Sequence, residues 1–168
     1  MEIAIMKRDN LNLIIGLVLI LLAVSLRILP HPDNFAPITA VALFGGAILT
    51  RRLGLWVPVA AMVVSDAIIG FHDLVLVTWG CYLLIALAAS YGLRKRTPAR
   101  VIGLTAGSSL FFFTVTNFAV WLFSDMYART WAGLSECFAL ALPFFRNTAL
   151  SDMVYTGALF GLYALAIK

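Results

Sequence analysis

The sequence predicts an all-α membrane protein with six transmembrane helices and with both termini on the cytoplasmic side. Of its 168 residues, 62% are hydrophobic and only 12% are charged, and the mean hydropathy is +0.99. A soluble domain of this size has too little interior for so much apolar surface, whereas a lipid bilayer solvates it. We therefore expect a single transmembrane domain that covers residues 1–168.

The first predicted helix, 11–29, is long enough to cross a hydrocarbon core of about 30 Å. It has no convincing small-residue cleavage site, so we interpret it as a retained helix and not as a signal peptide. Three prolines between residues 30 and 37 then exclude regular helix. The second helix, 38–49, is short and rich in Ala and Gly. It is either tilted with its neighbours or extended by the irregular stretch before it.

Four further apolar runs complete the prediction. The third helix covers 54–71 and contains Pro58, the fourth covers 74–93, and the Phe-rich fifth covers 101–123. The sixth, 138–167, is interrupted by Pro143 and a polar run at 146–148. Since proline removes a helical hydrogen bond, we expect two pieces joined by a kink.

The basic residues predict the orientation. With the N-terminus inside, nine of the twelve lie on the cytoplasmic side, and only Arg27, Arg129 and Arg146 lie outside. This bias follows the positive-inside rule. A re-entrant second segment would reverse every later loop and remove the bias. The nine are Lys7, Arg8, Arg51, Arg52, Arg94, Lys95, Arg96, Arg100 and Lys168.

Most acidic residues fall in the outer half, together with both histidines and several amides. The outer acids are Asp33, Asp66, Asp73, Asp125, Glu136 and Asp152. A channel would need polar groups through its full depth, so this pattern favours capture of a solute from outside. The chain has no GxxxxGK[ST] phosphate-binding loop, which excludes an intrinsic ATPase of that type, and the net charge of +4 needs no nucleic-acid partner.

The hairpin 65–82 concentrates ionisable residues between two apolar runs and is predicted to form one wall of an outer pocket. Polar groups persist in a membrane mainly where they face a cavity or a partner. Asp66 is either a pocket residue or the partner of Arg27 or Arg146. Tyr82 is expected at the rim of the pocket, and Trp79 in its apolar wall.

Cys81 is the most specific candidate on this hairpin. It is either a small apolar filler of a helix or a soft metal ligand beside Gly80, which leaves room for a bulky group. One thiolate cannot hold a bare zinc ion, which takes about four ligands. It could complete the coordination of a metal already held in a macrocycle.

Other candidates lie on the remaining outer segments. His31 and Asn34 belong either to a pocket lip or to a rigid connector, and Asn117 on the Phe-rich helix needs a polar partner. Arg146 either grips a ligand or pairs with Asp66 or Asp152. We also place Asn147 at the rim and Phe113 in the apolar wall.

These residues resemble a family of small six-helix bacterial membrane proteins similar to the substrate-binding S-components of energy-coupling factor (ECF) transporters. The resemblance extends from about residue 27 to the end. Its motifs are His31-Pro32, Asn34-Phe35, Pro37, Ala42-Leu43-Phe44-Gly45-Gly46, Ser65-Asp66, Gly70-Phe71-His72, Asn117-Phe118 and Pro143-Phe144-Phe145-x-Asn147-Thr148.

Cys81 narrows the resemblance to the BtuM-type solitary cobalamin transporters, which carry a cysteine in this segment. It implies uptake of cobalamin (vitamin B12) across the bacterial inner membrane, with Cys81 as a ligand of cobalt. It also implies a possible chemical step at Cys81, displacement of an upper axial ligand such as cyanide. The first helix lacks the AxxxA-like face of S-components that dock onto an ECF energising module, which favours a solitary mode.

Three alternatives stay open. The chain could be an S-component-like carrier for another vitamin or small molecule, with Cys81 merely packed. It could be a membrane enzyme that uses Asp66 and His72 as an acid–base pair. It could also be a structural subunit of a larger complex.

Overall fold

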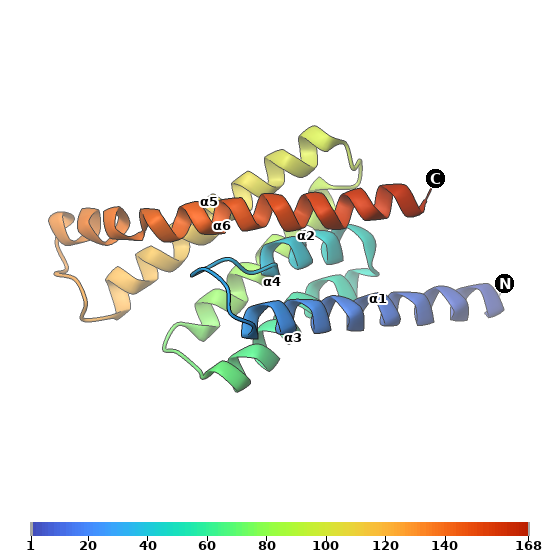
Figure 1. Ribbon diagram of the computed structural model, residues 1–168, viewed down its shortest axis with the longest axis horizontal. Helices are drawn as coiled ribbons and strands as arrows, with labels where there is room; N and C mark the ends of the chain where they lie inside the picture. The colour runs from blue at the N-terminus through green and yellow to red at the C-terminus, as the bar shows by residue number, and fades with distance from the viewer. Residues whose placement is uncertain (1, 168) are drawn as a thin grey trace.

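The computed structural model describes the backbone of residues 2–167 and the side chains of residues 9–167, and this part of the chain forms six α-helices and no strand. The start of α1 and the end of α6 lie at the same end of the bundle (Figure 1), which we call the near end. The opposite, far end holds the loops α1–α2, α3–α4 and α5–α6. The helices are α1 (Glu2–Ile28), α2 (Ile38–Ile48), α3 (Arg51–Ile69), α4 (Val75–Gly92), α5 (Pro98–Phe123) and α6 (Trp131–Ala166).

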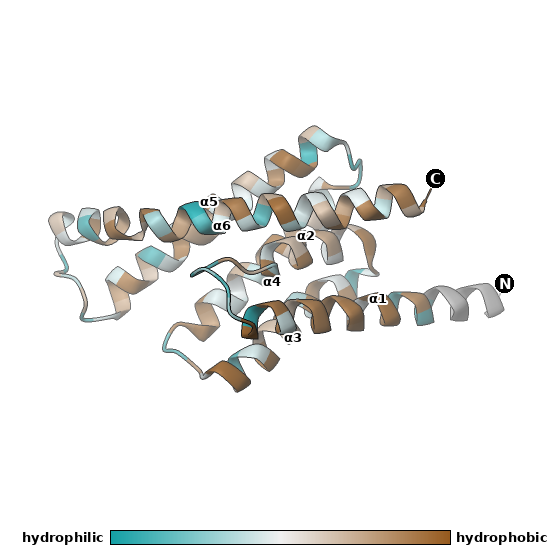
Figure 2. Ribbon diagram, in the orientation of Figure 1, coloured by the Kyte–Doolittle hydropathy of each residue, from teal (hydrophilic) through white to brown (hydrophobic). Residues whose placement is uncertain are grey.

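Five of these helices are long and apolar enough to cross a membrane: residues 9–28 of α1, and the whole of α3, α4, α5 and α6. Large apolar side chains cover their outward faces, among them Leu21 of α1 and Leu76 of α4, which is 76% exposed. Hydrophobic ribbon dominates the helices, while hydrophilic ribbon gathers in the α1–α2 loop and the first half of α6 (Figure 2). Such surface requires lipid in place of water, so the predicted multi-pass membrane fold is confirmed.

Helix α2 is the centre of the bundle. It packs against α1, α3, α4, α5 and α6, and its residues from Ile38 to Gly45 are all buried. A helix that is apolar all round is expected in such a place. Its 11 residues span only about 16 Å at 1.5 Å per residue, against a hydrocarbon thickness of about 30 Å.

The irregular stretch before α2 lengthens this segment of the chain at the far end. This is one of the two possibilities that the sequence left open for the short second helix. The helix starts after the far-end loop and ends at the near end, where the Arg96 guanidinium donates a hydrogen bond to the Ala47 carbonyl over 3.0 Å. The second segment is therefore not re-entrant, and α3 starts at the near end.

Glycine allows α2 to approach its neighbours closely. A β-carbon on Gly46 would overlap the backbone carbonyl of Ala86 on α4, and one on Gly54 of α3 would meet the carbonyl of Gly45 at 2.5 Å. Small residues permit such close packing in membrane helices. These contacts fix the α2–α3–α4 core that supports the far-end pocket.

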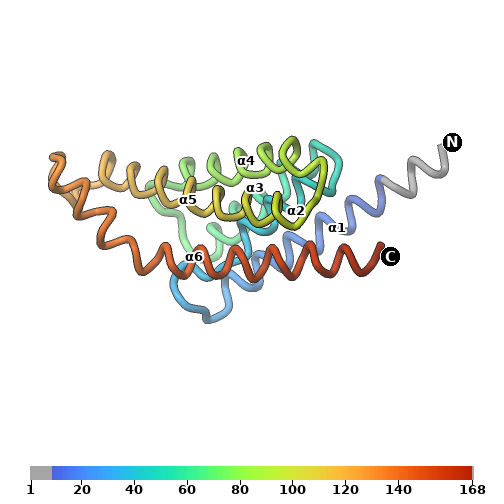
Figure 3. The backbone as a smooth tube through the Cα atoms, turned by 90° about the horizontal axis from the view of Figure 1, so that it is seen from above, coloured from blue at the N-terminus to red at the C-terminus, as the bar shows by residue number. Residues whose placement is uncertain are grey.

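Helix α6 differs from its prediction. It begins at Trp131, seven residues before the expected start at 138, and runs without a break through Pro143. The Thr130 hydroxyl caps it by accepting a hydrogen bond from the Gly133 amide over 3.2 Å. Proline removes only one donor from the ladder, so the helix bends in its first half instead of breaking (Figure 3).

The helix ends sort the charges as predicted. Arg51, Arg52, Arg94, Lys95, Arg96 and Arg100 lie at or next to near-end helix termini, whereas five of the six outer acids belong to the far half and Asp152 lies near the middle of α6. Lys7, Arg8 and Lys168 lie outside the side chains that the structure describes. The assignment of the near end to the cytoplasm stays a prediction that rests on this asymmetry.

Candidate functional site: a polar pocket at the far end

A cavity of about 350 Å³ is lined by residues of all six helices and of the far-end loops, and it reaches Asp152 near the middle of α6. Ligand pockets for drug-sized molecules occupy about 300–1,000 Å³ and combine apolar walls with a few polar groups. The lining matches that description. It comprises Arg27, His31, Asn34, Ala36, Ile38, Thr39, Met62, Ile69, His72, Thr78, Tyr82, Phe112, Thr148 and Asp152.

The α1–α2 loop forms one lip of this pocket and carries His31 and Asn34. Asn34 adopts a left-handed backbone conformation with φ of 59°, which asparagine tolerates better than most residues. The His31 ring nitrogens lie 2.7 Å from the Pro32 carbonyl and 3.1 Å from the Arg27 carbonyl. Each ring nitrogen thus lies within hydrogen-bond distance of a backbone carbonyl of the lip.

Asn147 ties the same loop to α6, since its side-chain amide donates to the Asp33 carbonyl over 3.0 Å. The predicted rim residues His31 and Asn34 therefore lie at the cavity, whereas Asn147 positions the loop that carries them. An irregular segment at membrane depth is tolerated where it lines a cavity in this way.

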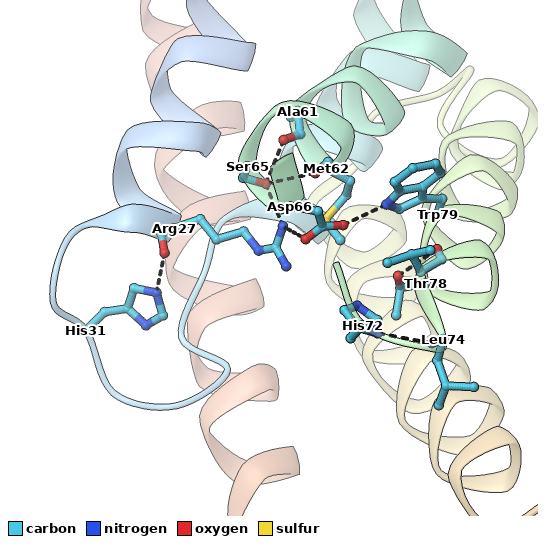
Figure 4. Close-up of polar contacts among 11 residues, drawn as sticks. Arg27, His31, Ala61, Met62, Ser65, Asp66, His72, Leu74, Thr78 and Trp79 are labelled. Carbon is cyan, nitrogen blue, oxygen red and sulfur yellow. Dashed lines mark hydrogen bonds and ion pairs between the residues drawn. The ribbon is translucent and has the colours of Figure 1, made fainter. Parts of the chain in front are cut away.

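Asp66 joins three helices beside the pocket (Figure 4). It is 1% exposed, its Oδ1 lies 2.6 Å from Arg27 Nη1 of α1, and its Oδ2 accepts a hydrogen bond from the Trp79 indole of α4 over 2.7 Å. Arg27 Nη1 also donates to the Ser65 hydroxyl at 2.5 Å, and its approach to Oδ1 lacks hydrogen-bond geometry, so charge holds that contact. Of the predicted alternatives for Asp66, the pair with Arg27 is confirmed.

The predicted hairpin wall is present, but only some of its side chains face the cavity. His72, Thr78 and Tyr82 line it. Tyr82 also stacks on Phe112 of α5, with ring centroids 4.9 Å apart and an interplanar angle of 27°. Trp79 does not line the pocket, because its indole is committed to Asp66 and its ring packs edge-on against Phe71 at 6.4 Å.

Cys81 does not face the pocket, in contrast to the expectation from the sequence. It is 2% exposed, and it is not among the residues that line the pocket. The reason is helical geometry: Thr78 and Tyr82 are one turn apart and share the pocket face, while Cys81 is rotated by about 100° from Tyr82. It fills space between helices, as a small apolar residue would.

Phe113 and Asn117 follow the pocket residue Phe112 along α5, toward the far end. They line a smaller cavity of about 120 Å³ that adjoins the pocket and shares Asn34, Phe112 and Thr148 with it. The Asn117 amide donates to the Phe113 carbonyl of its own helix over 2.7 Å, and Phe113 packs against Phe138 and Phe145 of α6. The amide therefore has the polar partner that burial demands, and the aromatic cluster joins α5 to α6.

Arg146 is exposed, and within residues 9–167 it forms no ion pair, so neither predicted pairing with Asp66 or Asp152 occurs. The hypothetical acid–base pair is not assembled either. Asp66 is occupied by Arg27 and Trp79, while His72 Nδ1 accepts a hydrogen bond from the Leu74 amide over 3.2 Å.

Sequence reasoning missed several lining residues, above all Asp152. This carboxylate of α6 is 1% exposed, lines the pocket and accepts a hydrogen bond from the Ser109 hydroxyl of α5 over 2.6 Å. The signal was present, since an acid deep in a long apolar segment is itself an indication of a site. Thr39, Phe112 and Thr148 carried no such signal, because only packing shows which face of a helix they occupy.

Among the described side chains, no three His, Cys, Asp or Glu residues gather closely enough to hold a metal ion. The pocket offers hydrogen-bonding groups, an aromatic pair and buried ionisable residues.

A family model described as a family of unknown function (DUF6580) matches residues 7–168. No curated protein and no solved structure matches the chain.

Proposed function

The chain belongs to the DUF6580 family, and we propose that it is a membrane-embedded binding protein that captures a small organic solute outside the bacterial inner membrane and releases it inward. The observation that carries the proposal is the far-end pocket of about 350 Å³, to which all six helices or their loops contribute polar and aromatic side chains. The resemblance of the sequence to ECF S-components is in keeping with this function.

The one-sided distribution of polar groups supports capture over conduction. Both pocket histidines and the buried Asp66 lie in the far half and Asp152 lies near the middle of α6, while the near end carries six described basic residues. Basic loops favour the cytoplasmic side, so the pocket is proposed to open outward. Release to the other side would then require the bundle to rearrange around α2.

The size of the cavity favours a ligand smaller than cobalamin. Its volume of about 350 Å³ lies at the low end of the range of about 300–1,000 Å³ typical of drug-sized ligands, and a corrinoid is larger than such molecules. Cys81 also lies outside its lining. We therefore favour a carrier for another vitamin-sized molecule, and cobalamin with cobalt ligation by Cys81 stays a prediction.

Ligand capture can be tested with a pocket-filling variant and a matched control on the same helix. Thr78→Trp places a large ring in the cavity, whereas Leu76→Trp places the same ring on a face that is 76% exposed. The wild type and the two variants are purified from cells grown in rich medium, and the small molecules that co-purify are identified by mass spectrometry. We expect one compound with wild type and Leu76→Trp that is lost with Thr78→Trp.

The same preparation separates the two ligand hypotheses. A visible corrin band in the wild type that changes shape in Cys81→Ala would establish cobalamin and cobalt ligation. A colourless protein that retains a smaller compound supports the carrier proposed here. If Thr78→Trp retains the compound as well as the wild type does, the pocket is not the binding site and the proposal fails.

A further inference from the structure

Asp152 is a buried carboxylate in the pocket with no cationic partner, and this isolation points to the chemical class of the ligand. Of the lining residues, all of which the structure describes, it is the one acid. Ser109 donates to its Oδ2 at 2.6 Å, and Thr39 is its other polar neighbour. Within residues 9–167 it forms no ion pair.

The other charges of the pocket do not compensate for Asp152. Arg27 is the lining residue with a permanent positive charge, and Asp66 neutralises it from 2.6 Å. His31 and His72 stand at exposed positions of the rim, where water and salt screen any charge they carry. An isolated ionised carboxylate is costly to bury, so buried acids are usually paired.

Two aromatic rings complete the environment. Tyr82 and Phe112 stack on each other, and both line the cavity together with Asp152. Aromatic rings attract cations electrostatically and recognise quaternary ammonium groups in particular. A carboxylate and an aromatic pair in one cavity thus offer a cation both a counter-charge and π-electron density.

We propose that the ligand carries a positively charged nitrogen, a protonated amine or a quaternary ammonium, which pairs with Asp152 and contacts the rings of Tyr82 and Phe112. This inference rests on the proposed function, because it assigns the ligand class of the same pocket. Binding would supply the partner that the buried carboxylate lacks in the free protein.

The probes are four small aromatic compounds of similar size: benzylamine and benzyltrimethylammonium as cations, benzyl alcohol as a neutral molecule and phenylacetate as an anion. Binding to the purified full-length protein is measured by thermal shift and by titration calorimetry, since a ligand that binds the folded state raises the melting temperature. We expect the cations to bind and the other two compounds to have no effect.

Asp152→Asn is the decisive variant because it is isosteric and the amide oxygen can still accept the hydrogen bond from Ser109. Removing one partner of a buried charge pair weakens binding by about thirtyfold or more, so we expect that loss of affinity for the cations. Asp125→Asn, at a fully exposed loop position, is the control and should bind as the wild type does. Phe112→Leu keeps the carboxylate and should also weaken the binding of benzyltrimethylammonium. This second variant tests the same site independently if Asp152→Asn fails to fold.

The outcomes distinguish the failure of the cationic ligand class from the failure of the solute-binding function. Binding of benzyl alcohol or phenylacetate that is lost in Thr78→Trp, with no preference for cations, would overturn the cationic ligand and leave the solute-binding function intact. Cation binding that Asp152→Asn leaves unchanged would also overturn it. If none of the four compounds binds and no small molecule co-purifies with the wild type, both proposals fail.

Discussion

Arg27 of α1 and Asp66 of α3 form an ion pair of 2.6 Å beside the pocket, and the carboxylate is 1% exposed while the arginine side chain is 19% exposed. The same arginine donates to Ser65, and the same aspartate accepts from Trp79 of α4. One charge pair thus connects three helices at the far end. Asp152 is the one acid that lines the pocket, and within residues 9–167 it has no ion-pair partner.

Removing Arg27 should destabilise the protein strongly. Arg27→Ala leaves Asp66 buried without its counter-charge, and breaking a buried pair in this way costs about 3–5 kcal/mol. The measurement is thermal or denaturant unfolding in detergent, with Asp66→Asn and the double variant to complete a cycle. We expect the double variant to be more stable than Arg27→Ala alone; additive losses would show that the two residues do not interact. Arg129→Ala, whose 4.0 Å pair with Asp125 is exposed, should unfold as the wild type does.

Gly46→Ala should disrupt the packing of α2 against α4. The added methyl group meets the backbone carbonyl of Ala86, which cannot move as a flexible side chain can. Overpacking of this kind costs about 1–3 kcal/mol, and we expect a lower melting temperature. Gly103→Ala is the matched control, because a β-carbon on Gly103 meets nothing within 4 Å and alanine is the better helix former. Equal melting temperatures for the two variants would contradict the close approach of α2 to α4.

Cys81 should be protected from thiol reagents in the folded protein. Both cysteines are free and only 2% exposed, so a membrane-impermeant maleimide should label the native protein slowly and the denatured protein fully. Asn34→Cys, on the exposed lip of the pocket, provides the positive control. Rapid labelling of the native wild type that is lost in Cys81→Ala would contradict this burial. It would show that the Cys81 thiol is accessible from the far-end pocket, as cobalt ligation requires.

The orientation of the bundle can be tested with two single cysteines in a Cys81→Ala, Cys137→Ser background. Met126 in the α5–α6 loop is 73% exposed at the far end, and Lys95 is exposed in the α4–α5 loop at the near end. If the near end is cytoplasmic, an impermeant reagent added to intact spheroplasts should label Met126→Cys and not Lys95→Cys. The reverse pattern would place the pocket on the cytoplasmic side and contradict capture from outside.

The helices were predictable to the extent that local sequence controls them. Apolar runs between prolines and charges located all six, and the end of α5 at Phe123 was predicted correctly. The start of α6 was predicted too late because the residues between the cap at Thr130 and residue 138 are less apolar than the rest of the helix. The kink expected in α6 is present as a bend, but the helix is not divided into two pieces, because a long helix can bend around one missing hydrogen bond.

The pocket was predictable in its place but not in its membership. His31, Asn34 and Tyr82 were expected at the cavity and line it, while Trp79 and Asn117 are committed to protein partners. Arg146 appeared as good a partner for Asp66 as Arg27 did, because the sequence fixes the depth of a residue along its helix and leaves the rotation of that helix open.

By itself, the sequence determined a multi-pass helical membrane protein with its polar groups concentrated toward one end, because hydrophobic length and charge position are properties of each segment alone. The tertiary structure decided that Tyr82 and Asp152 face a shared cavity while Cys81, adjacent to Tyr82 in the chain, does not. The physical reason is that neighbouring residues on a helix point about 100° apart, and only the packing of α2 among its neighbours selects which of these directions faces the cavity.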